Sequence, residues 1–339
     1  MEKQLNFRQK SGILSDGFPV EKSRSNFFHE SVFSMSITAF ILILSSILMH
    51  SLWHFLCKSS GRPSMAFFAL FSSSLFLTML PFALSSGLLL KLPKEAIIFA
   101  CCGAFSGAIC NTGLKWAYKY SDISLAYPMA RALPVFLTLL ITVLFGFGKS
   151  LTFCAVAGML IIFTGCLMMA LSQGGSHLGW KQKLFSLRKG LIGIVIASFG
   201  TTGYTIIDSY GMAVMKKFAP ECNGLLLAGT YSCIREFSAV LWMWLLAVIC
   251  ILRGTEKGAL KEMATKYHPY AAGVFAALAY VLILLSMNYV TNVSFVQAFR
   301  QLSLPIGALL GYLILKEKIT PFRWTALLLI MAGLFVSIL

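Results

Sequence analysis

Charged residues are scarce in this chain. Of its 339 residues, 12% are charged and 58% are hydrophobic, whereas soluble domains carry about 25% charged residues. This composition argues against an ordinary soluble protein. The formal net charge is nevertheless +16, and most of the basic residues lie in the amino-terminal tail and in polar breaks between apolar segments. Membrane proteins place Lys and Arg in such positions, so we expect no nucleic-acid partner.

Motifs for metals, disulfides and nucleotides are also missing. The nine cysteines are scattered singly, apart from the neighbours Cys101 and Cys102, and no C-x-x-C or Cys/His spacing occurs. Neither a disulfide framework nor a metal site is indicated. The chain lacks a G-x-x-x-x-G-K-[ST] loop, so ATP is not expected to drive the protein directly and no cofactor is predicted. The polar, basic residues 1–31 contain no apolar core of signal-peptide length, and we expect an uncleaved tail.

Long apolar segments occupy nearly all of the chain after this tail. Each is long enough to cross roughly 30 Å of hydrocarbon as a helix, the form that satisfies its own backbone hydrogen bonds there. The prediction is therefore an all-α integral membrane protein with ten transmembrane helices. The predicted spans are 33–56, 65–90, 95–118, 123–147, 151–171, 189–214, 223–252, 269–291, 294–315 and 322–339.

The second five segments resemble the first five. Ser-Asp-Ile-Ser at 121–124 is similar to Thr-Asn-Val-Ser at 291–294, and Gly165 matches Gly333 at an offset of 168 residues. Because five crossings is an odd number, a tandem copy must lie upside down relative to the first. We predict two inverted five-helix repeats, and such repeats are typical of carriers that bind substrate near mid-bilayer and work by alternating access. The predicted organisation is tail 1–31, first repeat 33–171, basic linker 172–188 and second repeat 189–339.

Several segments resemble one family. Leu-Ala-Tyr-Pro-Met-Ala-Arg-Ala-Leu-Pro at 125–134 is similar to the third-to-fourth-helix signature of EamA-type carriers, which belong to the drug/metabolite transporter superfamily. His-Ser-Leu-Trp-His at 50–54 resembles that family's first-helix His-x-x-Trp-Asn segment, with His54 in place of Asn. The segments 203–211 and 314–320 resemble a Tyr-Thr…Asp segment and the turn before the last helix. The likeness covers about residues 33 to 339.

The resemblance implies a secondary active or exchange transporter, not an enzyme, that moves a small polar or amphipathic metabolite across the inner (cell) or plasma membrane. Its expected partners are the small-molecule substrate and membrane lipids, and it would be a monomer or a homodimer. The family implies a cytoplasmic amino terminus, whereas the Lys and Arg of the loops favour an external one by a narrow margin. Residues 147–150, Phe-Gly-Lys-Ser, stand where the family has a Glu-containing turn. A symmetric role for Glu317 is therefore not implied.

Arginines inside the predicted spans are expected to have a specific structural or functional role, because placing a charge in hydrocarbon is energetically costly. Arg131 and Arg300 occupy matching places upstream of a proline, which leaves a backbone carbonyl without its donor. A guanidinium there can bind a carboxylate or phosphate through two hydrogen bonds, or it can hold the freed carbonyls. Both interpretations stay open for Arg131, and the structural one is favoured for Arg300. Arg235 and Glu236 are adjacent and point about 100° apart on a helix, which predicts separate partners.

Asp208 is an acidic residue deep in a span. Loss of hydration favours the neutral form of a lone carboxyl group, so Asp208 could load and release a proton, and we predict a proton-coupling role. The alternative is a carboxylate neutralised by a nearby arginine. Lys115, one turn from a span end, is expected to extend toward the headgroups.

Uncharged polar and aromatic residues complete the predicted site. His50, Trp53 and His54 lie roughly on one helix face, although an interfacial aromatic belt would also account for Trp53. Gly103-x-x-x-Gly107 indicates close helix packing. By family resemblance, the residues expected to line the central cavity are Asn111, Trp116, Tyr118, Tyr127, Asn288 and Gln297. Together with His50, Trp53, Arg131, Tyr204 and Arg300 they are the substrate-binding candidates.

Two other classes of protein fit the sequence less well. An integral-membrane enzyme or translocase acting on a lipid-linked substrate would need carboxylates or histidines clustered at the interface, and here they are dispersed over different spans. A channel would show a ring of like polar residues at one depth, and none is evident in the sequence. A carrier is therefore the favoured interpretation.

Overall fold

The computed structural model describes residues 36–61, 64–120, 123–146, 151–171, 188–305 and 320–337. Within these ranges the protein is helical and has no β-strand, which confirms the predicted all-α class. The long helices are α2 (Ile37–Ser59), α3 (Met65–Ser86), α4 (Lys94–Tyr120), α5 (Ile123–Phe145), α6 (Phe153–Leu171), α8 (Arg188–Phe218), α9 (Gly224–Leu252), α11 (His268–Ser286) and α14 (Pro321–Ser337). The short ones are α10 (Ala259–Ala264), η1 (Met287–Tyr289), α12 (Val293–Phe299) and η2 (Arg300–Leu302).

The helices have the length and composition of membrane-crossing segments. Five are long and apolar enough to cross a bilayer, and they lie in α3, α4, α8, α9 and α11; α2, α5, α6 and α14 contain shorter apolar stretches. Large apolar side chains also face outward from them, such as Leu241 and Leu245 on α9 and Phe335 on α14. A water-soluble surface rarely carries so many exposed apolar groups in contiguous patches. These features indicate a membrane protein.

Local capping residues set several helix ends. Ser64 accepts a hydrogen bond from the Phe67 amide at 3.1 Å and begins α3, as expected of an N-cap serine. Gly87, with φ at 65°, ends this helix earlier than the predicted span end at residue 90, because glycine tolerates the left-handed conformation of a C-cap. Asn292 caps α12 through the amide of Ser294 at 2.9 Å. The predicted span 294–315 is interrupted, since α12 ends at Phe299 and a 3₁₀ turn follows.

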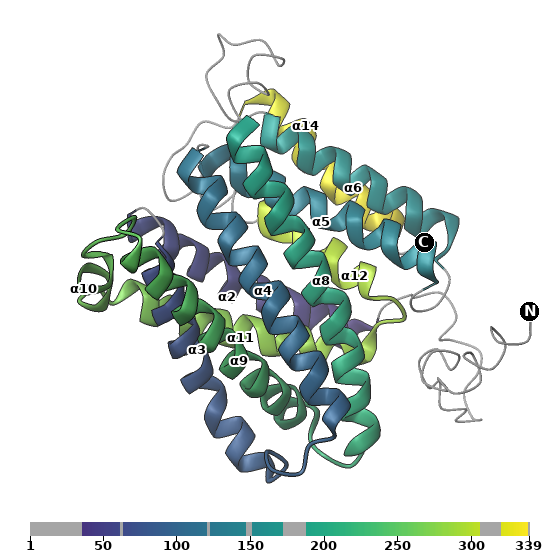
Figure 1. Cartoon of the computed structure of the whole chain (residues 1–339). Helices are drawn as coiled ribbons and strands as arrows, with labels where there is room; N and C mark the ends of the chain where they lie inside the picture. The colour runs from purple at the N-terminus through teal and green to yellow at the C-terminus, as the bar shows by residue number, and fades with distance from the viewer. Residues whose placement is uncertain are drawn as a thin grey trace, which may run out of the picture.

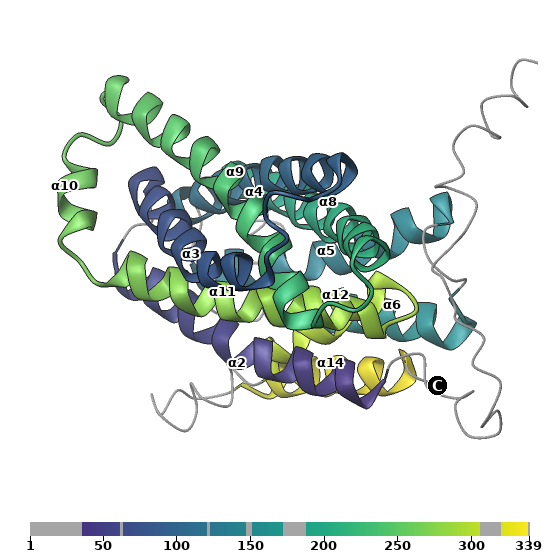
Figure 2. The same cartoon turned by 90° about the horizontal axis from the view of Figure 1, so that it is seen from below.

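The most extensive helix contacts join the first half of the chain to the second. Helix α4 packs along α8, α3 along α9, α2 along α11 and α6 along α14, and Figures 1 and 2 show these pairs side by side. Further contacts join α3 to α11 and α4 to α9. The regions before 171 and after 188 are therefore packed into one another rather than forming separate bodies.

Glycines permit the closest of these approaches. A Cβ atom added to Gly113 of α4 would meet backbone atoms of Gly193 and Ala197 at less than 3.0 Å, and one added to Gly193 would meet backbone atoms of Gly113 and Ala117. Helices α4 and α8 are thus in backbone contact, which only small residues allow. Any larger side chain at Gly113 or Gly193 would push the two helices apart.

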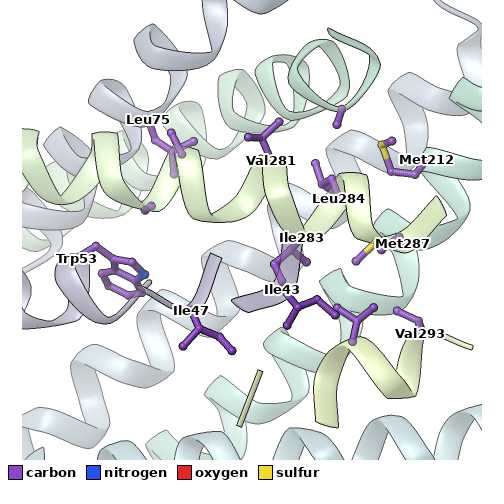
Figure 3. Packing of buried hydrophobic residues seen from close by; sticks show 14 of the residues in the cluster. Ile43, Ile47, Trp53, Leu75, Met212, Val281, Ile283, Leu284, Met287 and Val293 are labelled. Carbon is purple, nitrogen blue, oxygen red and sulfur yellow. The ribbon is translucent and has the colours of Figure 1, made fainter. Parts of the chain in front are cut away.

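Apolar side chains fill the space where α2 meets α11. Ile43 and Ile47 of α2 are fully buried in one cluster with Ile283 and Leu284 of α11, as Figure 3 shows. The hydroxyl of Ser46 donates to the carbonyl oxygen of Ala279 at 2.7 Å and adds a polar tie to this pair. This packing fixes α2 at one wall of the cavity described next.

Candidate functional site

A cavity of about 140 Å³ lies among the helices. Its walls come from α2, α3, α4, α5, α8, α9, α11, α12 and η2, so both halves of the chain contribute. The polar and aromatic residues that line it are Ser46, His50, Trp53, Phe71, Ser72, Asn111, Arg131, Thr201, Tyr204, Arg235, Glu236, Tyr280, Gln297 and Arg300. Four of them, Arg131, Arg235, Glu236 and Arg300, are charged residues from α5, α9 and η2, which is unusual for an apolar bundle.

Most of the predicted site residues meet at this cavity. The structure brings together His50, Trp53, Asn111, Arg131, Tyr204, Gln297 and Arg300. Trp116 and Asn288 are not among the lining residues, and the Trp116 side chain is 41% exposed and packs against Tyr120. The side chains of His54, Tyr118 and Tyr127, and Glu317 as a whole, lie outside the described part of the structure.

Trp53 and His50 form a hydrogen-bonded pair on α2. The Trp53 Nε1–H donates to His50 Nδ1 at 2.8 Å, and the Trp53 ring is buried with 8% exposure. Because Nδ1 accepts this bond, the His50 ring in its neutral form carries its proton on Nε2. The burial of Trp53 agrees with a place in the cavity wall and not with an interfacial aromatic belt.

Arg131 and Arg300 bring two buried guanidinium groups to the cavity. Arg131 Nη2 donates to the hydroxyl of Ser303 at 2.9 Å, so α5 is linked to the segment that follows η2. Arg300 Nη1 contacts Gln297 Oε1 at 3.4 Å, one turn back along the chain. Both of these acceptors, the Ser303 hydroxyl and the Gln297 amide oxygen, are neutral.

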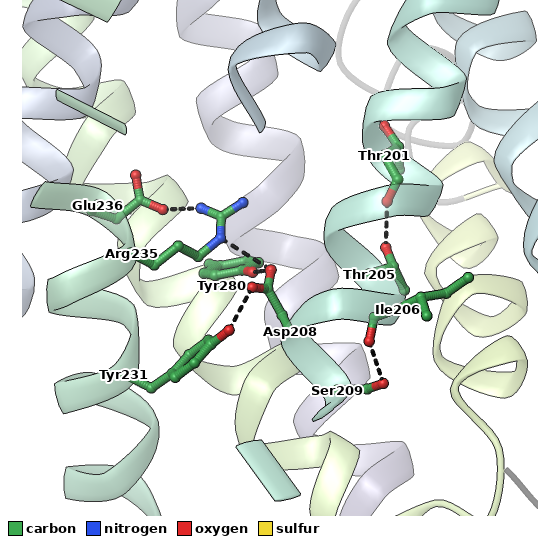
Figure 4. A network of polar contacts seen from close by, with 9 residues as sticks. All are labelled: Thr201, Thr205, Ile206, Asp208, Ser209, Tyr231, Arg235, Glu236 and Tyr280. Atoms are coloured by element: carbon green, nitrogen blue, oxygen red, sulfur yellow. Dashed lines mark hydrogen bonds and ion pairs between the residues drawn. The ribbon is translucent and has the colours of Figure 1, made fainter. Parts of the chain in front are cut away.

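Arg235 lies at the centre of a charged network between α8, α9 and α11. Its Nε donates to Asp208 Oδ2 at 3.0 Å, and its Nη1 is paired with Glu236 Oε1. Figure 4 shows the guanidinium between these two carboxylates. The prediction that Arg235 and Glu236 would have separate partners was therefore wrong, because both side chains are long enough to converge although their Cα–Cβ bonds diverge.

Asp208 is completely buried and lies behind the cavity wall rather than on it. Besides Arg235, it accepts hydrogen bonds from the hydroxyl groups of Tyr231, at 2.9 Å, and Tyr280. The structure therefore realises the alternative of a carboxylate neutralised by a nearby arginine. A proton-coupling role for Asp208 stays a prediction.

Helical spacing explains how the network assembles. Tyr204 and Asp208 are four residues apart on α8, as are Tyr231 and Arg235 on α9, so each pair lies on one helix face. Tyr280 of α11 completes the network. The Arg235 guanidinium carbon lies 4.5 Å from the ring centroid of Tyr280 and 5.2 Å from that of Tyr204, within the range of cation–π attraction.

Two glycines of α4 make room for this network. A Cβ on Gly103 would collide with the Asp208 carboxylate, and a Cβ on Gly107 would lie 3.1 Å from Arg235 Nη2. The Gly-x-x-x-Gly spacing thus accommodates charged side chains of α8 and α9. Close backbone packing of α4 on α8 occurs both beside Gly107, where a Cβ on Gly200 would meet backbone atoms of Ser106 and Cys110, and further along at Gly113.

Lys115 pairs with Glu256 at the end of the bundle. Its Nζ lies near the Glu256 carboxylate in the loop after α9, and Glu256 Oε2 also accepts from the Met65 amide at 2.9 Å. The lysine therefore extends toward a polar loop, as its position near a span end indicated. One carboxylate ties together the ends of α3, α4 and α9.

Comparison with known proteins supports the fold alone. No family model matches the chain, and no curated protein matches it. Solved structures do match, among them one described only as "Crystal structure of protein", with a TM-score of 0.60 and 15% sequence identity over 88% of this chain and 97% of that one. Across nearly their whole lengths the two chains are thus similar in fold.

Proposed function

We propose that this protein is a secondary active or exchange transporter that moves a small polar or amphipathic metabolite by alternating access. The observation that carries the proposal is a charge-lined cavity whose walls come from both halves of a helical membrane protein. Carriers bind substrate at such a place, between repeats. The resemblance of residues 125–134 and 314–320 to EamA-type carriers of the drug/metabolite transporter superfamily favours the same activity, in the inner or plasma membrane.

The pattern of helix contacts supports two inverted five-helix repeats. Suppose that α2, α3 and α4 of the first repeat correspond to α8, α9 and α11 of the second. The contact between α2 and α11 should then have a counterpart between α8 and α4. The contact between α3 and α11 should have a counterpart between α9 and α4. Both counterparts occur. The contacts α3–α9 and α6–α14 each join two helices that correspond to one another in the two repeats, so each of these contacts is its own counterpart. A two-fold relation between repeats produces such reciprocal contacts.

Arg131 is the group we propose for recognising an anionic part of the substrate. It is buried, lines the cavity and donates to a neutral hydroxyl, that of Ser303. Its planar fork suits a carboxylate or phosphate, whereas the point charge of a lysine does not offer two parallel hydrogen bonds.

Transport assays on reconstituted protein test the proposed function. Purified protein is first mixed with a metabolite panel, and compounds that raise its unfolding temperature are selected, because a bound ligand stabilises the folded state. Each selected compound is then loaded into proteoliposomes, and uptake of the same radiolabelled compound is measured. Counterflow that depends on the protein is expected. Stabilising compounds that are never transported, or that are chemically converted, would contradict the proposal.

A further inference from the structure

The guanidinium of Arg235 is held in a fixed position. Asp208 binds its Nε, the rings of Tyr204 and Tyr280 lie against it, and Arg235 itself is buried. These contacts come from two helices, α8 and α11, and leave the Nη1 and Nη2 atoms directed away from Asp208. A group held in this way loses little conformational freedom when a ligand binds.

The two carboxylates on Arg235 are held very differently. Asp208 is fully buried, does not line the cavity and receives two tyrosine hydroxyl bonds in addition to the ion pair. Glu236 does line the cavity, and within the described part of the structure its hydrogen bonds come from Arg235 alone. Asp208 is therefore a permanent partner of Arg235, and Glu236 is the more easily displaced one.

One donor atom of Arg235 also faces open space. Among the described residues no atom accepts a hydrogen bond from Nη2, and a Cβ atom added to Gly107, which lines the cavity, would lie 3.1 Å from it. The edge formed by Nη1 and Nη2 is the edge that binds carboxylates and phosphates through two parallel bonds. At present Glu236 occupies only its Nη1 end.

We propose that the Nη1–Nη2 edge of Arg235 is an anion-binding position of the cavity, and that Glu236 is a resident counter-ion which a carboxylate or phosphate group of the ligand displaces. The inference rests on the proposed function, since it takes the cavity as the substrate site. It adds a second position to that of Arg131 and assigns opposite roles to two acidic residues: Asp208 positions the arginine, and Glu236 competes with the ligand.

The charges around the cavity are compatible with an incoming anion. Asp208, Glu236 and Arg235 together carry one net negative charge when all are ionised, and Arg131 and Arg300 add two positive charges to the same cavity wall. The remaining titratable groups there are His50, Cys110, Tyr204 and Tyr280. When the ligand anion replaces Glu236 on Arg235, the guanidinium keeps a partner, and the displaced Glu236 carboxylate stays in the cavity that Arg131 and Arg300 also line.

Anion binding to the purified, detergent-solubilised protein tests the inference without transport. The probes are sodium benzoate and inorganic phosphate, each compared with sodium chloride at equal ionic strength, and apparent affinity is obtained from the rise in unfolding temperature with concentration. The wild-type protein should respond to at least one probe. Glu236→Gln removes the competitor and should bind that probe about tenfold more tightly or better, because the probe no longer has to displace a charged hydrogen-bond partner from Arg235. Glu262→Gln, on the exposed helix α10, is the matched control and should bind as wild type.

A steric variant gives an independent test that changes no charge. Gly107→Ala places a methyl group 3.1 Å from Arg235 Nη2 and should weaken binding of the same probe severalfold or more, whereas Gly224→Ala, whose added methyl meets only Leu285, should not. The inference is overturned if Glu236→Gln binds no more tightly than wild type, if Gly107→Ala binds as wild type, or if neither probe exceeds chloride. Transport of uncharged metabolites by the same preparation would then leave the transporter proposal standing.

Discussion

Gly165 of α6 and Gly333 of α14 lie in reciprocal contact across one helix pair. A Cβ on Gly165 would meet Ile330 and the carbonyl oxygen of Ala326, and a Cβ on Gly333 would meet Ile162 and the carbonyl oxygen of Gly158. The partners of the two glycines are separated by the same 168 residues as the glycines themselves. The offset found in the sequence thus corresponds to a local two-fold relation in space, which supports the proposed repeat.

This reciprocity predicts equal effects from equivalent substitutions. Gly165→Ala and Gly333→Ala each place a Cβ within 3.0 Å of the facing helix, so each should lower the free energy of unfolding by roughly 1–3 kcal/mol, the usual cost of overpacking. Thermal unfolding in detergent measures both. Thr164→Ala, at an exposed neighbouring position, should change stability little. Destabilisation by only one of the two glycine variants would argue against the two-fold relation.

Replacement of Arg131 tests its proposed contact with the substrate. Arg131→Lys keeps the charge and loses the planar fork, so transport of an anionic substrate should fall about tenfold or more while the protein still folds. Counterflow in proteoliposomes measures the rate, and size-exclusion behaviour reports folding. Arg253→Lys, at an exposed position after α9, is the control. Wild-type transport by Arg131→Lys would favour a structural role for this arginine.

Asp208→Asn separates an anchoring role from proton coupling. The amide cannot accept all the hydrogen bonds that Arg235, Tyr231 and Tyr280 donate to Asp208, and loss of one partner of a buried ion pair costs about 3–5 kcal/mol. We expect lower stability and loss of both exchange and gradient-driven uptake. A stable variant that keeps exchange but no longer accumulates substrate in response to a pH gradient would instead support the proton-coupling role predicted from the sequence.

Ten crossings predict that the two ends of the chain lie on the same side of the membrane. Single cysteines at position 5 and after Leu339, in a background where the exposed Cys101 and Cys102 are serine, should react with the same impermeant reagent from the same face. Cells and inverted vesicles provide the two orientations. Labelling of the two cysteines from opposite faces would rule out ten crossings.

The helices could be predicted from the sequence because their signals are local. The long hydrophobic segments of the sequence predict the positions of α3, α4 and α9 closely. Asn292, the N-cap of α12, lies in the segment 291–294, which resembles residues 121–124 in the sequence. The end of α12 at Phe299 was missed, although Pro305 indicates that a regular helix cannot continue unchanged through this segment.

The charged network could not be predicted in the same way. Arg235 and Asp208 are 27 residues apart, and their contact depends on how α8 packs beside α9. The four-residue spacing of Tyr231 and Arg235 indicates that they share one face of a helix. Gly107, which has no side chain, indicates free space on its own helix. Only the packing of α4, α8, α9 and α11 brings these separate signals to one place.

The pairing of α2 with α11 has a consequence for biosynthesis. Ser46 and Ala279, which are hydrogen-bonded across this pair, are 233 residues apart in the chain. Helix α2 leaves the ribosome early, and α11, which covers its packed face, is synthesised only after the described helices α3, α4, α5, α6, α8 and α9. Long-range contacts of this kind form late. Until α11 is synthesised, the contact face of α2 is therefore exposed to lipid or to the insertion machinery. The time needed to synthesise the chain as far as α11 sets a lower limit on the time in which the native fold can form.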